Sequence, residues 1–194
     1  MTQLTPEILE LSLRPKNAGI AADADGFGAD VDLACGSVVR FSISLSIDGK
    51  AVTGVRFNSN GCGYMVAVAD ALCSHLSDRH LDSLGGLQQM DLAETVSTIV
   101  GPIPHERRHC ATTCIAAVRN AFANCRERRI AGFHGDDPLI CSCFGVGENT
   151  IRAVIEQNNA DSVDAVTTAC NAGGGCGSCR MLIQELIDSV IEPI

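Results

Sequence analysis

Apolar and polar side chains alternate strictly along residues 40–47. A period of two predicts a β-strand with one buried face and one solvent-exposed face. Asp48-Gly49 follows and favours a tight hairpin turn, so residues 52–57 are expected to form the return strand. Residues 14–37 are rich in Gly, Asp and Asn and show little periodicity, so we expect a loop there.

Beyond this hairpin the apolar spacing changes to that of helices. Apolar residues recur every three or four positions over 65–76, and the longest predicted helix covers residues 105–129. Shorter helices are expected at 81–87 and at 91–100, the second with Asp91 as its N-cap and Glu94 at position N3. We therefore expect an α+β domain in which helices pack against a small antiparallel sheet.

The remaining chain predicts a second, smaller unit. Gly, Asp and Pro residues end the helical pattern over 132–138, and short apolar stripes then predict helices near 151–155, 163–166 and 181–190. Asp161 is expected to open the second of these helices, and no segment shows a convincing strand pattern. The predicted domains are residues 1–132, which are α+β, and residues 138–194, which are all-α.

Charge and composition exclude several functions. The net charge is −9, and residues 135–194 carry 2 basic and 9 acidic side chains, which argues against non-specific nucleic-acid binding. No apolar run is long enough to span a membrane, and residues 1–10 lack the basic start of a signal peptide. With eleven cysteines, we expect a cytoplasmic protein that uses reduced thiols for metal or sulfur chemistry. Nothing in the sequence predicts hydrolysis or nucleotide binding.

Four of the cysteines form two closely spaced pairs, Cys141-x-Cys143 and Cys176-x-x-Cys179. Two short pairs bring four sulfurs together while closing only one long loop, and four thiolates suit tetrahedral zinc or an iron–sulfur cluster. The glycines around Cys176 let backbone amides approach the sulfurs closely. A zinc site stays open as an alternative, although C-x-C spacing is less typical of zinc.

Residues 138–194 resemble the BFD-like [2Fe–2S] domain. The shared motifs are Cys-Ser-Cys at 141–143, Gly-Val-x-x-x-x-Ile at 145–151 and Ala-Gly-Gly-Gly-Cys-Gly-Ser-Cys at 172–179. The resemblance implies a stably bound [2Fe–2S] cluster in a small helical fold, with the ligands Cys141, Cys143, Cys176 and Cys179. Cys170 lies outside the motif, and we expect it to be a small buried residue on a helix.

Three further cysteines are candidates for chemistry, although 26 and 47 residues separate them. Cys35 lies in a Gly-containing loop, whereas Cys62 and Cys110 lie at predicted helix starts, where thiolates are favoured. From spacing alone, each of these cysteines is explained equally well as a plain core residue and as part of a reactive site.

Residues 15–126 resemble the IscU/NifU N-terminal scaffold domain. The shared motifs are Asn-Ala-Gly at 17–19, Ala-Cys-Gly at 34–36, Gly-Cys-Gly at 61–63 and His-Cys at 109–110. The order of the two domains is also that of NifU proteins, which assemble iron–sulfur clusters for nitrogenase. The resemblance implies that Cys35, Cys62 and Cys110 bind a transient cluster, iron or zinc, that His109 is a fourth ligand, and that Cys110 receives sulfur from a cysteine desulfurase.

The sequence departs from this family in three places. Ser37 stands where the family has Asp after Cys-Gly, and a hydroxyl is a poorer iron ligand than a carboxylate, so we expect a slower-releasing cluster or altered metal binding. The chaperone-recognition stretch is replaced by Ile103-Pro104-His105-Glu106-Arg107. The sequence ends at Ile194, where NifU proteins continue into a further domain, which is expected for a two-domain version.

The leading hypothesis is a scaffold that assembles iron–sulfur clusters and transfers them to recipient apo-proteins, and that is not an enzyme. It would work with a cysteine desulfurase, possess a permanent C-terminal cluster that supplies electrons, and form a homodimer. The alternative is a ferredoxin-type electron-transfer protein whose N-terminal domain only docks partners. A zinc-bound structural or regulatory protein is the third hypothesis.

Overall fold

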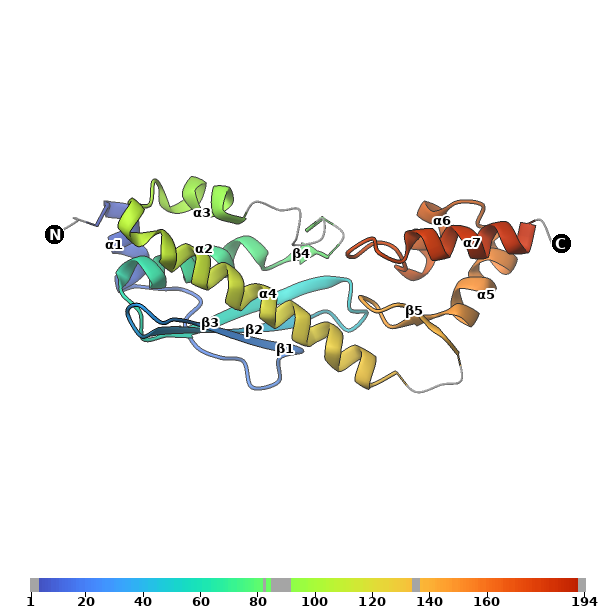
Figure 1. The fold of residues 1–194 in the computed structure, drawn as a ribbon, viewed down its shortest axis with the longest axis horizontal. Coiled ribbons are helices and arrows are strands. Elements are labelled where there is room, and N and C mark those ends of the chain that lie inside the picture. Colours follow the sequence, from blue (N-terminus) through green and yellow to red (C-terminus); the bar gives the residue numbers. More distant parts are fainter. Residues whose placement is uncertain (1–3, 82, 85–91, 134–136, 192–194) are drawn as a thin grey trace. The chain divides into compact units, whose positions relative to one another are not determined.

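The computed structural model describes residues 4–81, 83–84, 92–133 and 137–191. They group into two compact units, which are described separately below (Figure 1). The first comprises Met1–Arg79 with Asp91–Cys125, and the second comprises His80–Met90 with Arg126–Ile194. The domain bounds 1–132 and 138–194 stay a prediction.

An antiparallel sheet forms the base of the first unit. The strands, in the order β1-β2-β3-β4, are β1 (Gly26–Asp32), β2 (Ser37–Leu45), β3 (Ala51–Ser59) and β4 (Arg79–His80). The predicted strand and its hairpin partner are confirmed as β2 and β3, with Phe41 opposite Phe57 and both rings buried. β2 ends at Leu45, two residues earlier than predicted, and Ile47 is fully exposed in the turn.

The prediction of a loop over residues 14–37 was wrong for β1. Gly26 and Gly28 lie under the long helix α4 (Arg108–Ala131), and a Cβ at Gly28 would lie 2.1 Å from the backbone nitrogen of Ala121. These glycines therefore permit close helix–strand packing, whereas in the sequence they had indicated a loop. Side chains of α4 also satisfy this edge strand: Asn124 Oδ1 accepts from Phe27 N–H and Asn120 Nδ2 donates to the Ala29 carbonyl.

Helices cover the sheet of the first unit (Figure 1). Besides α4 they are α1 (Pro6–Leu13), α2 (Gly63–Leu76), α3 (Leu92–Val100) and the 3-10 turn η1 (His105–Arg107). The predicted helices at 65–76, 91–100 and 105–129 are confirmed, while most of 81–87 and the N-cap Asp91 lie outside the described residues. Helix α1 was not predicted, although Thr5 caps its first turn and Ile8 anchors it in the core.

The Asn17-Ala18-Gly19 motif joins the sheet to α2. Phe57 N–H donates to the Asn17 carbonyl, and Gly19 N–H donates to the Phe57 carbonyl. The backbone N–H and the side-chain amide of Asn17 both donate to the buried carboxylate of Asp70 on α2. The motif therefore has a structural role: it holds α2, and Cys62 before it, against the sheet.

The second unit is helical apart from one short hairpin. Its elements are β5 (Leu139–Cys141), β6 (Val146–Gly147), α5 (Glu148–Asn158), α6 (Val163–Cys170) and α7 (Arg180–Ile191). The three predicted helices are confirmed, but the expectation of no strand was wrong. Strands of three and two residues are too short to show a period, and the turn between them uses Gly145 at φ +65°. Ser162, and not Asp161, caps α6.

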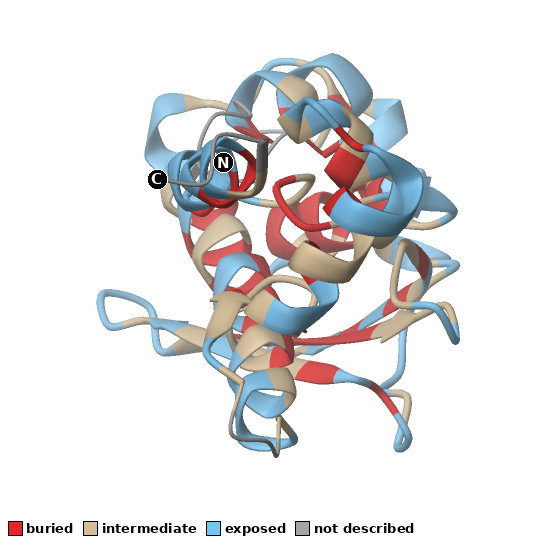
Figure 2. Cartoon of the chain, turned by 90° about the vertical axis from the view of Figure 1, so that its right-hand side faces the viewer, coloured by how far each residue is buried: buried red, intermediate tan, exposed pale blue. Residues whose placement is uncertain are grey.

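Each unit has an aliphatic core (Figure 2). In the second unit the fully buried side chains come from all three helices, and they include Ile151, Val166 and Ile183. Cys141 and Cys179 belong to the same buried cluster. The α+β fold of the first part and the helical fold of the second are thus as the sequence predicted.

Candidate functional site

The three upstream cysteines, far apart in the sequence, come together at one end of the first unit. Cys62 is the N-cap of α2, Cys110 lies in the first turn of α4, and Cys35 lies in the turn between β1 and β2. The Sγ atoms of Cys62 and Cys110 are 3.7 Å apart. The charge of Cys35 also acts on the pKa of Cys110, so the third thiol lies within electrostatic range of this pair.

The pair of thiols has unequal acidity. Burial is the main cause that raises the pKa of Cys110 to about 12. Partial burial acts in the same direction on Cys62, but the backbone N–H groups of Met65 and Tyr64 and the thiol of Cys110 lower its pKa overall. The N-terminus of α2 thus makes Cys62 the better thiolate of the two.

Arg107 places positive charge beside these thiols. Its guanidinium acts to lower the pKa of both Cys62 and Cys110, and its Cζ lies 5.8 Å from the centre of the Tyr64 ring. Within the described residues its buried Nε has no hydrogen-bond partner. The side chain is therefore a fixed cation that favours anionic sulfur at this site.

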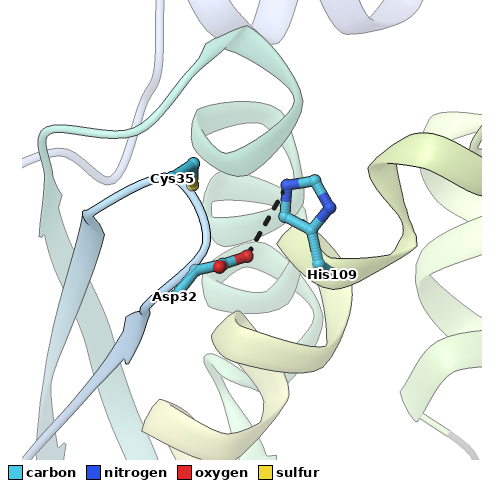
Figure 3. A group of neighbouring side chains, drawn as sticks. All are labelled: Asp32, Cys35 and His109. Carbon is cyan, nitrogen blue, oxygen red and sulfur yellow. Dashed lines mark ion pairs between the residues drawn. The ribbon is translucent and has the colours of Figure 1, made fainter.

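Asp32 is a site residue that the sequence reasoning missed (Figure 3). Its Oδ2 lies 3.6 Å from Nε2 of His109, and the ligand atoms of Asp32, Cys35 and His109 all lie within 4.8 Å of one another. Cys35 Sγ is also 3.1 Å from the hydroxyl of Ser37. No signal for Asp32 was present in the sequence, because its position beside Ser37 depends on the pairing of β1 with β2, and β1 was not predicted.

The four downstream cysteines all lie around the short hairpin and the start of α7. Cys141 ends β5, Cys143 lies in the hairpin turn, and Cys176 and Cys179 lie in the loop before α7. Helix α7 begins directly after Cys179, at Arg180. The carbonyl of Cys179 accepts from Ile183 N–H, so the residue still borders the first helical turn.

These four thiols form two hydrogen-bonded pairs. Cys179 is the main cause that lowers the pKa of Cys141, to about 6, and the same hydrogen bond raises the pKa of Cys179. Burial raises the pKa of Cys143 to about 11, and its partner in the other pair is Cys176. Burial also acts to raise the pKa of Cys176, but the hydroxyl and N–H of Ser178 lower it overall.

Backbone N–H groups point at the sulfurs of both pairs. Gly173 N–H donates to Cys141 and to Cys179, and Cys176 N–H donates to Cys143 Sγ at 3.5 Å. Gly173 and Gly177 have φ of +88° and +76°, a conformation that favours glycine. At Gly175 a Cβ would lie 2.7 Å from the Cβ of Cys143, so only glycine lets this loop approach the cysteine.

The donor set fits a cluster with two metal ions. Four thiolates on one zinc, with Zn–S bonds of about 2.3 Å, would lie roughly 3.8 Å apart. Among residues 4–81, 83–84, 92–133 and 137–191, however, the ligand atoms that lie within 4.8 Å of one another in a group of three or more are those of Asp32, Cys35 and His109. No three of the four C-terminal thiols therefore lie that close together in the described residues. Two thiol pairs instead match two irons with two thiolates each, as a [2Fe–2S] cluster requires.

The remaining cysteines have structural surroundings. Cys73 and Cys114 are completely buried. Cys125 is buried where α4 packs against Gly26. Cys170 is only half-buried, and its thiol donates to the Val166 carbonyl. All eleven cysteines lie in the described part of the chain, and no disulfide joins them.

Comparison with known families agrees with both groups of thiols. A family model described as the NifU-like N terminal domain matches residues 3–131, and one described as the BFD-like [2Fe-2S] binding domain matches residues 139–189. The chain belongs to the NifU-like family. These family descriptions support iron–sulfur clusters as its cofactors.

Curated relatives of this NifU-like chain are named as nitrogen-fixation or iron–sulfur cluster assembly proteins. The "Nitrogen fixation protein NifU" of Trichormus azollae is 32% identical over 200 positions, which cover 99% of this chain and 65% of that protein. The chain thus spans about two thirds of the length of this curated relative. The "Iron-sulfur cluster assembly scaffold protein IscU" of Aquifex aeolicus is 29% identical over 104 residues, or 54% of this chain and 64% of that protein.

A solved structure supports the fold of the first unit. The crystal structure of a nitrogen-fixing NifU-like protein (N-terminal) from Brucella abortus superposes with a TM-score of 0.51 at 16% identity. The superposition covers 63% of this chain and 94% of the Brucella abortus chain. Across the described residues of this NifU-like chain, the helices are too short or too polar to cross a membrane.

Proposed function

We propose that this NifU-like chain is a scaffold that assembles iron–sulfur clusters on Cys35, Cys62 and Cys110 and passes them to recipient apo-proteins. The observation that carries the proposal is that three thiols from three separate elements lie at one site: Cys62 Sγ is 3.7 Å from Cys110 Sγ, and the exposed Cys35 lies within electrostatic range of Cys110. Thiols on an exposed turn and at helix starts can bind iron while leaving it open to removal.

The second thiol group would hold a resident [2Fe–2S] cluster on Cys141, Cys143, Cys176 and Cys179. Such a cluster exchanges one electron at a time when bound. The residues of the chain supply its retention: buried Cys141 and Cys179 anchor one side, and N–H groups from Gly173 and Cys176 stabilise thiolate charge.

The N-terminal site of Cys35, Cys62 and Cys110 would receive sulfur from a cysteine desulfurase. Sulfur transfer needs an accessible thiolate, and Cys110, the acceptor implied by family resemblance, is 1% exposed with its pKa raised to about 12. Binding of iron, or of the desulfurase, must therefore expose or deprotonate Cys110 if it is the acceptor. The chain performs no turnover chemistry of its own in this proposal, and a reducing cytoplasm would keep its eleven thiols available.

The experiment that tests the proposal is absorption and Mössbauer spectroscopy after anaerobic reconstitution with ferrous iron, cysteine, a cysteine desulfurase and a thiol reductant, which supplies the two electrons that convert each persulfide sulfur to sulfide. The full chain is expected to show a stable and a labile cluster. Cys35→Ala, Cys62→Ala and Cys110→Ala should each lose the labile signal and keep the stable one, while Cys170→Ser should retain both. A ferredoxin whose N-terminal domain only docks partners would show a single cluster, unaffected by these three changes.

A further inference from the structure

We propose that Asp32 supplies an oxygen ligand beside Cys35 when the N-terminal site binds its metal. This inference rests on the proposed function and deepens it, because it names the donor that completes the thiol site. A carboxylate from β1 would then do what the hydroxyl of Ser37 does poorly, since neutral hydroxyls are weak ligands for iron and zinc.

The hairpin holds the carboxylate of Asp32 in one orientation. Asp32 is the last residue of β1, and its Cα partner across the hairpin is Ser37. Oδ1 accepts from Ala34 N–H at 2.8 Å, and the Asp32 carbonyl accepts from Gly36 N–H at 2.8 Å. These two bonds close the turn that carries Cys35, so they fix the carboxylate and the thiol relative to each other. Oδ2 remains directed at His109.

The distance between Asp32 and His109 suits two ligands of one ion. Oδ2 and Nε2 are 3.6 Å apart, which is longer than the 2.7–3.2 Å of ordinary N–H···O hydrogen bonds. With metal–nitrogen and metal–oxygen bonds of about 2.0–2.2 Å, tetrahedral ligands lie roughly 3.4 Å apart. Cys35 Sγ lies within 4.8 Å of both atoms, on an exposed turn that a small movement would close.

The burial of the Asp32 side chain also supports its role as a metal ligand. The side chain of Asp32 is only 9% exposed, whereas that of His109 is 38% exposed. A largely buried carboxylate is costly unless it is paired, and its neighbours here are one backbone N–H and an imidazole that is charged only when protonated. A bound divalent cation would compensate this negative charge directly.

The donors of the site then fall into two sets. Cys62 and Cys110 form one, with their sulfurs 3.7 Å apart, and Cys35 with Asp32 and His109 forms the other. This division resembles the two thiol pairs of the C-terminal site, but one thiolate is replaced by oxygen and nitrogen. Harder donors bind iron–sulfur clusters less tightly than thiolates, which suits a site that must release its cargo.

The test is zinc affinity, measured on the full chain with its C-terminal cluster in place by competition with a chromophoric chelator. Asp32→Asn keeps the side-chain oxygen that accepts from Ala34 but removes the charge. It should weaken zinc binding by at least about 10-fold, since loss of a group that only orients a metal ligand already costs about 10- to 100-fold. Asp30→Asn is the matched control, because it removes the same charge from the same strand, and it should bind zinc like the unmodified chain.

A second variant places the carboxylate on the opposite strand. Because Ser37 is the Cα partner of Asp32, Asp32→Asn with Ser37→Asp should recover most of the lost affinity, while Ser37→Asp alone should change it less than about 3-fold. Unchanged zinc affinity in Asp32→Asn, or an equal loss in Asp30→Asn, would overturn the inference.

X-ray absorption at the zinc edge makes the test independent of how well Asp32→Asn folds. In His109→Ala, one oxygen neighbour should remain around zinc if Asp32 is a ligand, and an all-sulfur shell would contradict it. Cys62→Ala separates this inference from the proposed function. If Cys62→Ala loses zinc and Asp32→Asn does not, only the role of Asp32 fails; if neither loses zinc, the scaffold site fails as well.

Discussion

The two thiol groups of this chain use the same donor atoms in different surroundings. Around Cys141, Cys143, Cys176 and Cys179 the partners are mainly backbone N–H groups from glycine-rich turns. Around Cys35, Cys62 and Cys110, backbone N–H groups of Met65 and Tyr64 act on Cys62, and the other partners are side chains: a carboxylate, an imidazole, a guanidinium and a hydroxyl.

This difference separates retention from release. Backbone donors are fixed by the fold, and they stabilise thiolate charge without having to reorganise. Side chains such as His109 and Cys35 are partly or fully exposed and can move when a partner binds. A resident cluster needs the first kind of surroundings, and a cargo cluster needs the second.

The largest expected effect comes from breaking one pair of the C-terminal group. Cys143→Ser should remove essentially all of the stable cluster, because it leaves Cys176 without its partner thiol and gives one iron a poor hydroxyl ligand. Visible absorption and iron content measure the loss. Cys170→Ser is the matched control outside the motif, and equal cluster loss in both variants would show that the effect is not one of ligation.

A smaller effect is expected in the reactivity of the N-terminal pair. Folding raises the pKa of Cys110 to about 12 and lowers that of Cys62, so at pH 8 Cys62 carries far more thiolate. In the metal-free chain iodoacetamide should label Cys62 at least about 10-fold faster, since each pKa unit changes the thiolate fraction tenfold. Labelling of Cys110 should rise about tenfold per pH unit and level off only near pH 12, whereas labelling of Cys62 should level off at a lower pH. Peptide mass spectrometry over a pH series would reveal equal rates, which would contradict this order.

The smallest effect concerns the strand that carries Asp32. A Cβ at Gly28 would lie 2.1 Å from the backbone of α4, whereas one at Gly54 would meet nothing within 4 Å. Gly28→Ala should therefore lower the free energy of unfolding by about 1–3 kcal/mol through overpacking. Denaturant unfolding monitored in the far ultraviolet measures this change, with Gly54→Ala as the control. A Gly28→Ala chain as stable as Gly54→Ala would contradict the packing of α4 on β1.

The sequence predicted those features that depend on local pattern. Alternation over residues 40–47 is enough to predict β2, and the short spacing of Cys141 from Cys143 is enough to predict a shared site. It failed where a residue's role depends on a distant partner. Gly26 and Gly28 looked like loop residues because the helix that requires them lies about 90 positions later.

Asp32 shows the same limit at the candidate site. Its proximity to Cys35 and His109 follows from the β1–β2 register and from the place of α4 on the sheet. Neither can be obtained from spacing when β1 itself is unpredicted. Cys125 shows a similar limit, because its charged sequence neighbours give no sign of the close contact with Gly26 that buries its thiol.

The most direct test of the central claim is a chelator challenge of the reconstituted full chain, in which iron and acid-labile sulfide are followed over time. The account predicts two phases: iron bound by the N-terminal thiols is lost quickly, and a remainder of two irons and two sulfides per chain, as expected for one [2Fe–2S] cluster, persists. Loss of all iron in a single phase, or zinc in place of iron at the C-terminal thiols, would contradict it.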